Sequence, residues 1–125
     1  MYPIETKNAR IVDTYLGIED HGILTWRLDF DYGGAGQSFG GYTGDQPSPT
    51  LGRLTSTRGL KRVGRAEFGT SIRALLDALG VSSWEQLKGQ VVRVEASNMK
   101  VHKVGHIIND NWFDYDYVTA AHRED

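Results

Sequence analysis

The clearest pattern in the chain is an alternation of apolar and polar residues over positions 23–32. One face of a strand there would carry Leu24, Trp26, Leu28 and Phe30, and the other face Thr25, Arg27, Asp29 and Asp31. A period of two residues predicts a half-buried antiparallel strand. A weaker alternation with β-branched residues over positions 8–16 predicts a preceding strand, and residues 17–22 are expected to connect the two.

A glycine-rich segment follows the second strand. Residues 32–37 predict a tight turn, and residues 37–43 predict a return strand that contains Phe39 and Tyr42. Gly40 and Gly41 within this strand indicate either a bulge or the close approach of another backbone, in a space that a ligand could use. The bulge is the simpler interpretation.

Helical spacing appears later in the chain. The apolar residues that recur at this spacing are Phe68, Ile72, Leu75, Leu76 and Leu79. Thr70 or Ser71 is expected to cap the start of this helix, and Gly80 suits the position after its end. Residues 82–85 (SSWE) match the capping-box pattern, in which Ser82 and Glu85 satisfy backbone groups reciprocally. They predict a short second helix that runs to Leu87.

Two further strands are predicted over residues 90–96 and 100–109. The order β-β-β-α-α-β-β predicts an α+β fold, with a mostly antiparallel sheet and the main and short helices on one side of it. Residues 44–65 form a long irregular loop, of a length that is usually either functional or mobile. Residues 118–125 are expected to be a frayed tail.

Length and composition limit the architecture further. A chain of 125 residues, 39% hydrophobic and 24% charged, is expected to form one globular domain. It has no cysteine, which excludes a disulfide framework, a thiolate nucleophile and cysteine-based metal sites. No segment has the apolar length of a membrane span or the pattern of a signal peptide, so we expect a cytoplasmic protein that does not contact a membrane.

The chain does not match the sequence motifs that are typical of catalysis or cofactor binding. Gly34, Gly36 and Gly40 have the wrong spacing for a dinucleotide fingerprint, and a strand follows them where that motif needs a helix. No Walker A loop or nucleophile elbow is present. His102 and His106 would lie about 13 Å apart on a strand, too far to share one metal ion. No catalytic residue, metal or cofactor is therefore predicted, and the chain is expected to be a binding protein.

Charge is unevenly distributed although the net charge is only −2. Residues 51–65 contain no acid and five basic residues, Arg53, Arg58, Lys61, Arg62 and Arg65. Arginine offers a planar set of donors that suits phosphate, and the nearby rings of Trp26, Phe39 and Tyr42 could stack a base if they face outward. The basic segment could equally be a solvated loop, or could contact the acidic, aromatic residues 109–125 of another subunit in a homo-oligomer.

Three segments, LGIEDHGILT (16–25), DYGGAGQSFGGY (31–42) and GVSSWEQLKGQVVRVEA with VGHIINDNWF (80–113), resemble small early-region proteins of bacteriophages and prophages. Some phage proteins of this size are anti-defence sponges, including the anti-Thoeris type, which sequester cyclic-nucleotide or cyclic ADP-ribose-like signals. The resemblance implies capture of a phosphate-bearing nucleotide signal and assigns no site residue. The alternative expectation is an accessory protein that binds single-stranded nucleic acid, or a protein partner in phage replication, recombination or host inhibition.

Overall fold

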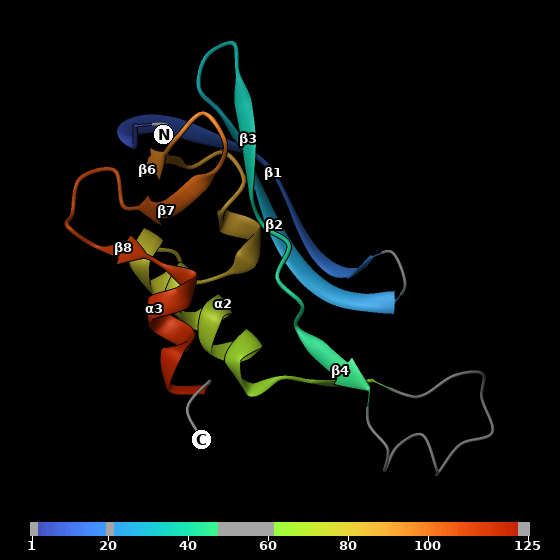
Figure 1. Ribbon diagram of the computed structural model, residues 1–125. Helices are drawn as coiled ribbons and strands as arrows, with labels where there is room; N and C mark the ends of the chain where they lie inside the picture. The colour runs from blue at the N-terminus through green and yellow to red at the C-terminus, as the bar shows by residue number, and fades with distance from the viewer. Residues whose placement is uncertain (1–2, 20–21, 48–61, 123–125) are drawn as a thin grey trace.

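The computed structural model describes residues 3–19, 22–47 and 62–122. Its main sheet is antiparallel and has six strands. In spatial order they are β3 (Gly36–Gly40), β2 (Ile23–Asp31), β1 (Glu5–Glu19), β6 (Val91–Ala96), β7 (Val101–Gly105) and β8 (Trp112–Phe113). The predicted α+β class and the mostly antiparallel sheet are confirmed (Figure 1).

Helical elements cover one side of this sheet (Figure 1). They are α2 (Ala66–Leu79), the 3-10 turn η2 (Trp84–Gln86), α3 (Tyr115–Thr119) and the 3-10 turn η3 (Ala120–His122). Helices α2 and α3 contact each other, and α2 also contacts β8. No helix in the described part of the chain is long and apolar enough to span a membrane.

The core lies between the sheet and α2. Trp26, Leu28 and Phe30 are buried on the face of β2 that the alternation predicts. Phe68, Leu75 and Leu79 are buried on the predicted apolar face of α2. Burial of this apolar surface is the main stabilising contribution to the fold, at about 25 cal/mol per Å² removed from water.

The start of α2 differs from the prediction. The helix begins after Arg65, whose extended backbone forms the N-cap without a side-chain hydrogen bond. Ser71, expected as a cap, instead lies inside the helix, and its hydroxyl donates to the Phe68 carbonyl. Gly80 ends the helix with φ 72°, as predicted.

The expected capping box at residues 82–85 is also wrong in detail. The Ser82 amide and hydroxyl both donate to the side-chain oxygen of Gln86 (2.8 and 3.3 Å), so Glu85 is not the residue that reaches back. The resulting helix is the single turn η2. Gln86 has a side chain as long as that of glutamate and lies one residue later, so it takes the role expected of Glu85.

The predicted 44–65 loop begins and ends as a two-stranded ribbon. Strand β4 (Asp45–Pro47) pairs antiparallel with β5 (Arg62–Gly64), and residues 48–61 lie outside the described part. The expected tail is also corrected: α3 and η3 extend through residues 118–122, and Thr119 is fully buried. At Gly40, φ is 120° and a Cβ would lie 3.0 Å from the Arg27 Cα, so a neighbouring backbone does approach closely here.

The sheet curls until its β3 edge approaches β7. The Gln37 side-chain amide spans this gap and donates to the carbonyls of Ser97 (3.1 Å) and Asn98 (3.4 Å) in the β6–β7 turn. Residues after β3 thereby come close to β7 and to the start of α3, although they lie far apart in the sequence. The pocket described next opens at this place.

Candidate functional site

Two of the three aromatic residues predicted to stack a ligand belong to the core. Trp26 is fully buried and Phe39 is 4% exposed. The Trp26 indole N–H donates to the Ser71 hydroxyl (3.1 Å), and its ring meets those of Phe39 and Phe113 edge to face. These rings cannot stack an external base, because the alternation of their strands directs them under the helices. The expectation is corrected for both residues.

The basic residues predicted to bind phosphate divide into two groups. Arg53, Arg58 and Lys61 lie outside the described residues. Arg62 binds the buried Asp45 carboxylate through two nitrogens, at 2.8 and 2.9 Å. Arg65 donates to the Asp45 carbonyl (3.3 Å) and lies 3.6 Å from a Glu67 oxygen. Arg62 and Arg65 therefore act as structural anchors in this arrangement.

Asp45 fixes the β4–β5 ribbon to the main sheet. Besides binding Arg62, its carboxylate accepts the Leu24 amide of β2 (3.2 Å). The hydrogen bond from Arg62 is the largest influence that holds the pKa of Asp45 below its usual value of 3.8, against the opposing effect of burial. The carboxylate is thus ionised and paired at neutral pH.

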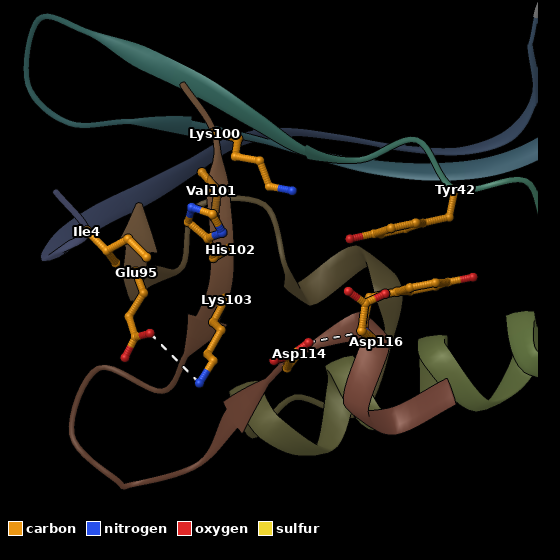
Figure 2. A pocket seen from close by; sticks show the side chains of 10 residues that line it. Ile4, Tyr42, Glu95, Lys100, Val101, His102, Lys103, Asp114 and Asp116 are labelled. Atoms are coloured by element: carbon orange, nitrogen blue, oxygen red, sulfur yellow. Dashed lines mark hydrogen bonds and ion pairs between the residues drawn. The ribbon is translucent and has the colours of Figure 1, made fainter. Parts of the chain in front are cut away.

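Tyr42, the third predicted aromatic residue, lies at the rim of a pocket of about 340 Å³. We call this the β7–α3 pocket (Figure 2). Its walls come from the segment after β3, from β6 and β7, and from the start of α3. It is lined by Ile4, Tyr42, Glu95, Lys100, Val101, His102, Lys103, Asp114, Tyr115 and Asp116.

Lysines lie on one wall of the pocket and aspartates on the other. Lys100, His102 and Lys103 lie on the β7 side, whereas Asp114 and Asp116 lie across from them at the start of α3 (Figure 2). Lys103 approaches Glu95 at 3.9 Å, a long and partly exposed ion pair that contributes little energy. The pocket can therefore receive an anionic group at one wall and hydrogen-bond donors at the other.

The acidic wall is held in place by a helix cap. Asp114 is the N-cap of α3, and its carboxylate accepts the amides of Asp116 (3.1 Å) and Tyr117 (3.4 Å). An aspartate at this position satisfies donors that the first turn leaves open and so fixes the start of the helix. This cap positions both Asp116 and Tyr115 at the pocket.

A stacked pair of tyrosines closes the end of the pocket. The rings of Tyr42 and Tyr115 lie 3.5 Å apart and are parallel to within 2°. The Tyr42 hydroxyl points into the pocket (Figure 2). Burial, followed by the negative charge of Asp116, raises the pKa of Tyr42 well above its usual value of 10.0. The hydroxyl is therefore neutral at physiological pH and can donate a hydrogen bond to a ligand.

The two histidines considered as a metal pair have separate environments. His102 lines the pocket, whereas His106 lies beyond the end of β7, which stops at Gly105. The His106 Nδ1 accepts the amides of Ile108 (3.1 Å) and Asn109 (3.0 Å), which folds residues 106–111 into a turn where a longer strand was expected. Within residues 3–19, 22–47 and 62–122, no group of three His, Cys, Asp or Glu side chains could hold a metal ion.

Sequence patterns did not identify the basic wall. Lys100, His102 and Lys103 are two lysines and a histidine at and beside the start of a short strand, and nothing in their spacing indicates a pocket. Asp114 followed by Tyr115 and Asp116 did carry a signal, because aspartate before a short helix is a preferred N-cap. Comparisons with models of protein families, with characterised proteins and with solved structures found no match. The candidate site is therefore supported by the arrangement of its residues alone.

Proposed function

We propose that this chain is a non-enzymatic binding protein that holds a small phosphate-bearing ligand of the nucleotide class in the β7–α3 pocket. The observation that carries the proposal is the opposition of Lys100, His102 and Lys103 to Asp114 and Asp116 across one pocket. A nucleotide has the matching polarity, because its phosphate is an anion and its ribose and base carry hydroxyl and amino donors. The pocket volume of about 340 Å³ suits a ligand of that size.

Each wall would recognise a different part of the ligand. The ammonium groups of Lys100 and Lys103 would donate charge-assisted hydrogen bonds to the phosphate. The Asp116 carboxylate would accept from a ribose hydroxyl or an exocyclic amine, a use of carboxylates known from dinucleotide-binding folds. The Tyr42 hydroxyl would donate to an acceptor between them.

One feature of the lining supports binding without chemistry. The raised pKa of Tyr42 keeps its hydroxyl protonated, so this hydroxyl can donate a hydrogen bond to a ligand and is a poor base. A protein that binds and does not turn over its ligand fits the role of a sponge for a nucleotide signal, which is the role that the resemblance to phage proteins implies.

Calorimetric titration against cyclic mononucleotides, cyclic dinucleotides and ADP-ribose isomers tests the proposal. We expect at least one to bind, and to be recovered unchanged after incubation. Lys103→Gln removes one charged donor at the pocket, and we expect it to weaken binding by about 10–100-fold, the equivalent of about 1.5–3 kcal/mol. Lys88→Gln is the matched control, since Lys88 is exposed, lies outside the pocket and pairs only loosely with Asp13 (3.7 Å).

The same titrations separate a small ligand from single-stranded nucleic acid. An oligonucleotide that neutralises many phosphates would lose affinity steeply with salt, with a slope of about −0.7 per phosphate contact. A mononucleotide held by one phosphate would depend on salt far less. The absence of binding by the whole panel, or an equal effect of Lys88→Gln and Lys103→Gln, would contradict the proposal.

A further inference from the structure

The β1–β2 ribbon extends beyond the layer of helices (Figure 1). Val12, Leu16 and Ile18 are 42%, 41% and 66% exposed. Leu16 pairs with Trp26 across the ribbon, so it lies on the face that continues the core. Three exposed aliphatic side chains along seven residues of one strand form an apolar surface that needs an explanation.

Within the described residues, one edge of the same ribbon has no neighbouring strand beyond Ile11. Strand β6 pairs with β1 only over residues 5–10, and the backbone of Ile11 bonds to Gln90 (2.8 Å) and Gly89 (2.7 Å). From Val12 to the end of β1, the strand pairs with β2 alone within the described part of the chain. A long bare edge with apolar side chains is a template for another strand.

The register identifies which backbone groups face outward. The Ile11 amide and carbonyl point away from β2, toward residues 89 and 90, and a register shift follows between Ile11 and Asp13. Since backbone groups alternate in direction along a strand, the outward groups beyond the shift belong to Thr14, Leu16 and Ile18. Leu16 is the middle residue of these three.

Local side chains already occupy part of this edge. The Asp13 carboxylate accepts the Thr14 amide (3.0 Å), and the Tyr15 hydroxyl donates to the Ile18 carbonyl (2.7 Å). Both bonds agree with the direction deduced from the register. No such bond covers the Leu16 amide or carbonyl in the described part of the chain, so the bare stretch is centred on Leu16.

We infer that a second copy of this chain pairs with the bare edge, β1 antiparallel to β1, about a two-fold axis at Leu16. An antiparallel edge is self-complementary under such an axis, because each donor meets an acceptor. The two copies of Leu16 then lie opposite each other, and Thr14 of each copy lies opposite Ile18 of the other. The result is a continuous four-stranded ribbon with its apolar residues side by side.

Charge at the ends of this pairing is only partly compensated. In the same register, Asp13 of one copy lies opposite Glu19 of the other, which would place like charges together. Arg27 binds Glu19 at 2.8 Å and reduces the repulsion. The local bonds of Thr14 and Ile18 are exchanged for bonds between the strands when the copies associate.

Light scattering during size exclusion tests the pairing. We expect the wild-type chain to show twice the monomer mass of 13.9 kDa, and Leu16→Lys to show the monomer mass, because a charged side chain on an edge prevents strand addition. Val91→Lys is the matched control, since Val91 is 39% exposed on β6, and it should remain dimeric. A monomeric wild type, or loss of the dimer in both variants, would overturn the inference.

A cross-link locates the axis even if a lysine at Leu16 disturbs folding. The chain has no cysteine, so Leu16→Cys introduces a single thiol. Opposed residues in a hydrogen-bonded pair have Cα atoms about 5.5 Å apart, within the range of about 4.4–6.8 Å that a disulfide bridges. Oxidised glutathione should convert Leu16→Cys to a covalent dimer and leave Val91→Cys monomeric on a denaturing gel. Equal cross-linking of the two, or none at Leu16→Cys, would refute the β1–β1 arrangement.

Discussion

Tyr42 and Tyr115 lie face to face, with ring centroids 3.5 Å apart and an angle of 2° between the rings. The first follows the edge strand β3 and the second begins α3. Their contact joins two segments that are separated by most of the chain. It closes one end of the β7–α3 pocket and makes the shape of that pocket depend on the curl of the sheet.

Alkaline pH should destabilise the protein through Tyr42. Its folded pKa is raised above the usual 10.0, mainly by burial, so the neutral hydroxyl is favoured in the folded state. The resulting stabilisation is complete below pH 10.0 and is lost as the pH rises from there toward the folded pKa. We expect Tyr42→Phe, which keeps the stacked ring, to show a weaker loss of stability above about pH 10, as measured by urea unfolding at several pH values. An identical pH profile in the two proteins would contradict this cause.

Acid should weaken the anchor between Asp45 and Arg62. The folded pKa of Asp45 is lowered from 3.8, first by the hydrogen bond from Arg62. The stabilisation is therefore present above pH 3.8 and lost as the pH falls through the lower folded value. Asp45→Asn should reduce the free energy of unfolding at neutral pH by about 2–3 kcal/mol, with a flatter profile in acid.

Asp77→Asn is the comparison for this anchor. Asp77 pairs with Arg73 at 3.0 Å, but the two side chains are 62% and 82% exposed. Exposed pairs contribute about 0–1 kcal/mol, so this variant should unfold close to the wild type at neutral pH. A larger loss from Asp77→Asn than from Asp45→Asn would show that burial does not decide the strength of these pairs.

Ser71 should be sensitive to loss of its hydroxyl. Its oxygen accepts the indole N–H of Trp26 (3.1 Å), and both residues are fully buried. Ser71→Ala leaves that N–H without a partner and should cost about 1–3 kcal/mol in thermal or urea unfolding. Ser38→Ala removes an exposed hydroxyl that binds Asp29 (2.7 Å) and should cost less than about 0.5 kcal/mol. Equal costs would refute a special role for the buried bond.

Replacing two glycines in or beside α2 by alanine should change the stability of the fold in opposite directions. A Cβ at Gly44 would overlap the ring of Phe68, whereas one at Gly69 would meet nothing within 4 Å. Gly44→Ala should destabilise the fold by about 1–3 kcal/mol, because the core must shift. Gly69→Ala lies in the helix and should stabilise it by about 0.5–1 kcal/mol. Thermal unfolding of both variants distinguishes the cases, and a stabilised Gly44→Ala would show that the Phe68 ring moves away freely.

Much of the fold follows from local pattern. The alternation around Trp26 predicted β2 and its buried face, and helical spacing from Phe68 to Leu79 predicted α2. These predictions succeeded because burying one face of an element imposes its own period on the sequence. The short helix near Gln86 was predicted, but its bond from Ser82 to Gln86 was not. The start of α2 was missed because Arg65 caps it without a side-chain hydrogen bond. The helix after Asp114 was missed because a short element carries few periodic positions.

The sequence by itself determined the α+β fold class, with a mostly antiparallel sheet and helices on one side of it. It also determined which faces of β2 and α2 are apolar. Only the tertiary structure decided that Trp26 and Phe39 are core residues, that Arg62 binds Asp45, and that Lys103 and Asp116 line opposite walls of one pocket. Periodicity reports which side of an element is buried. It does not report which distant element covers that side, because the curl of the sheet and the close approach of β3 to β7 depend on contacts between residues far apart in the chain.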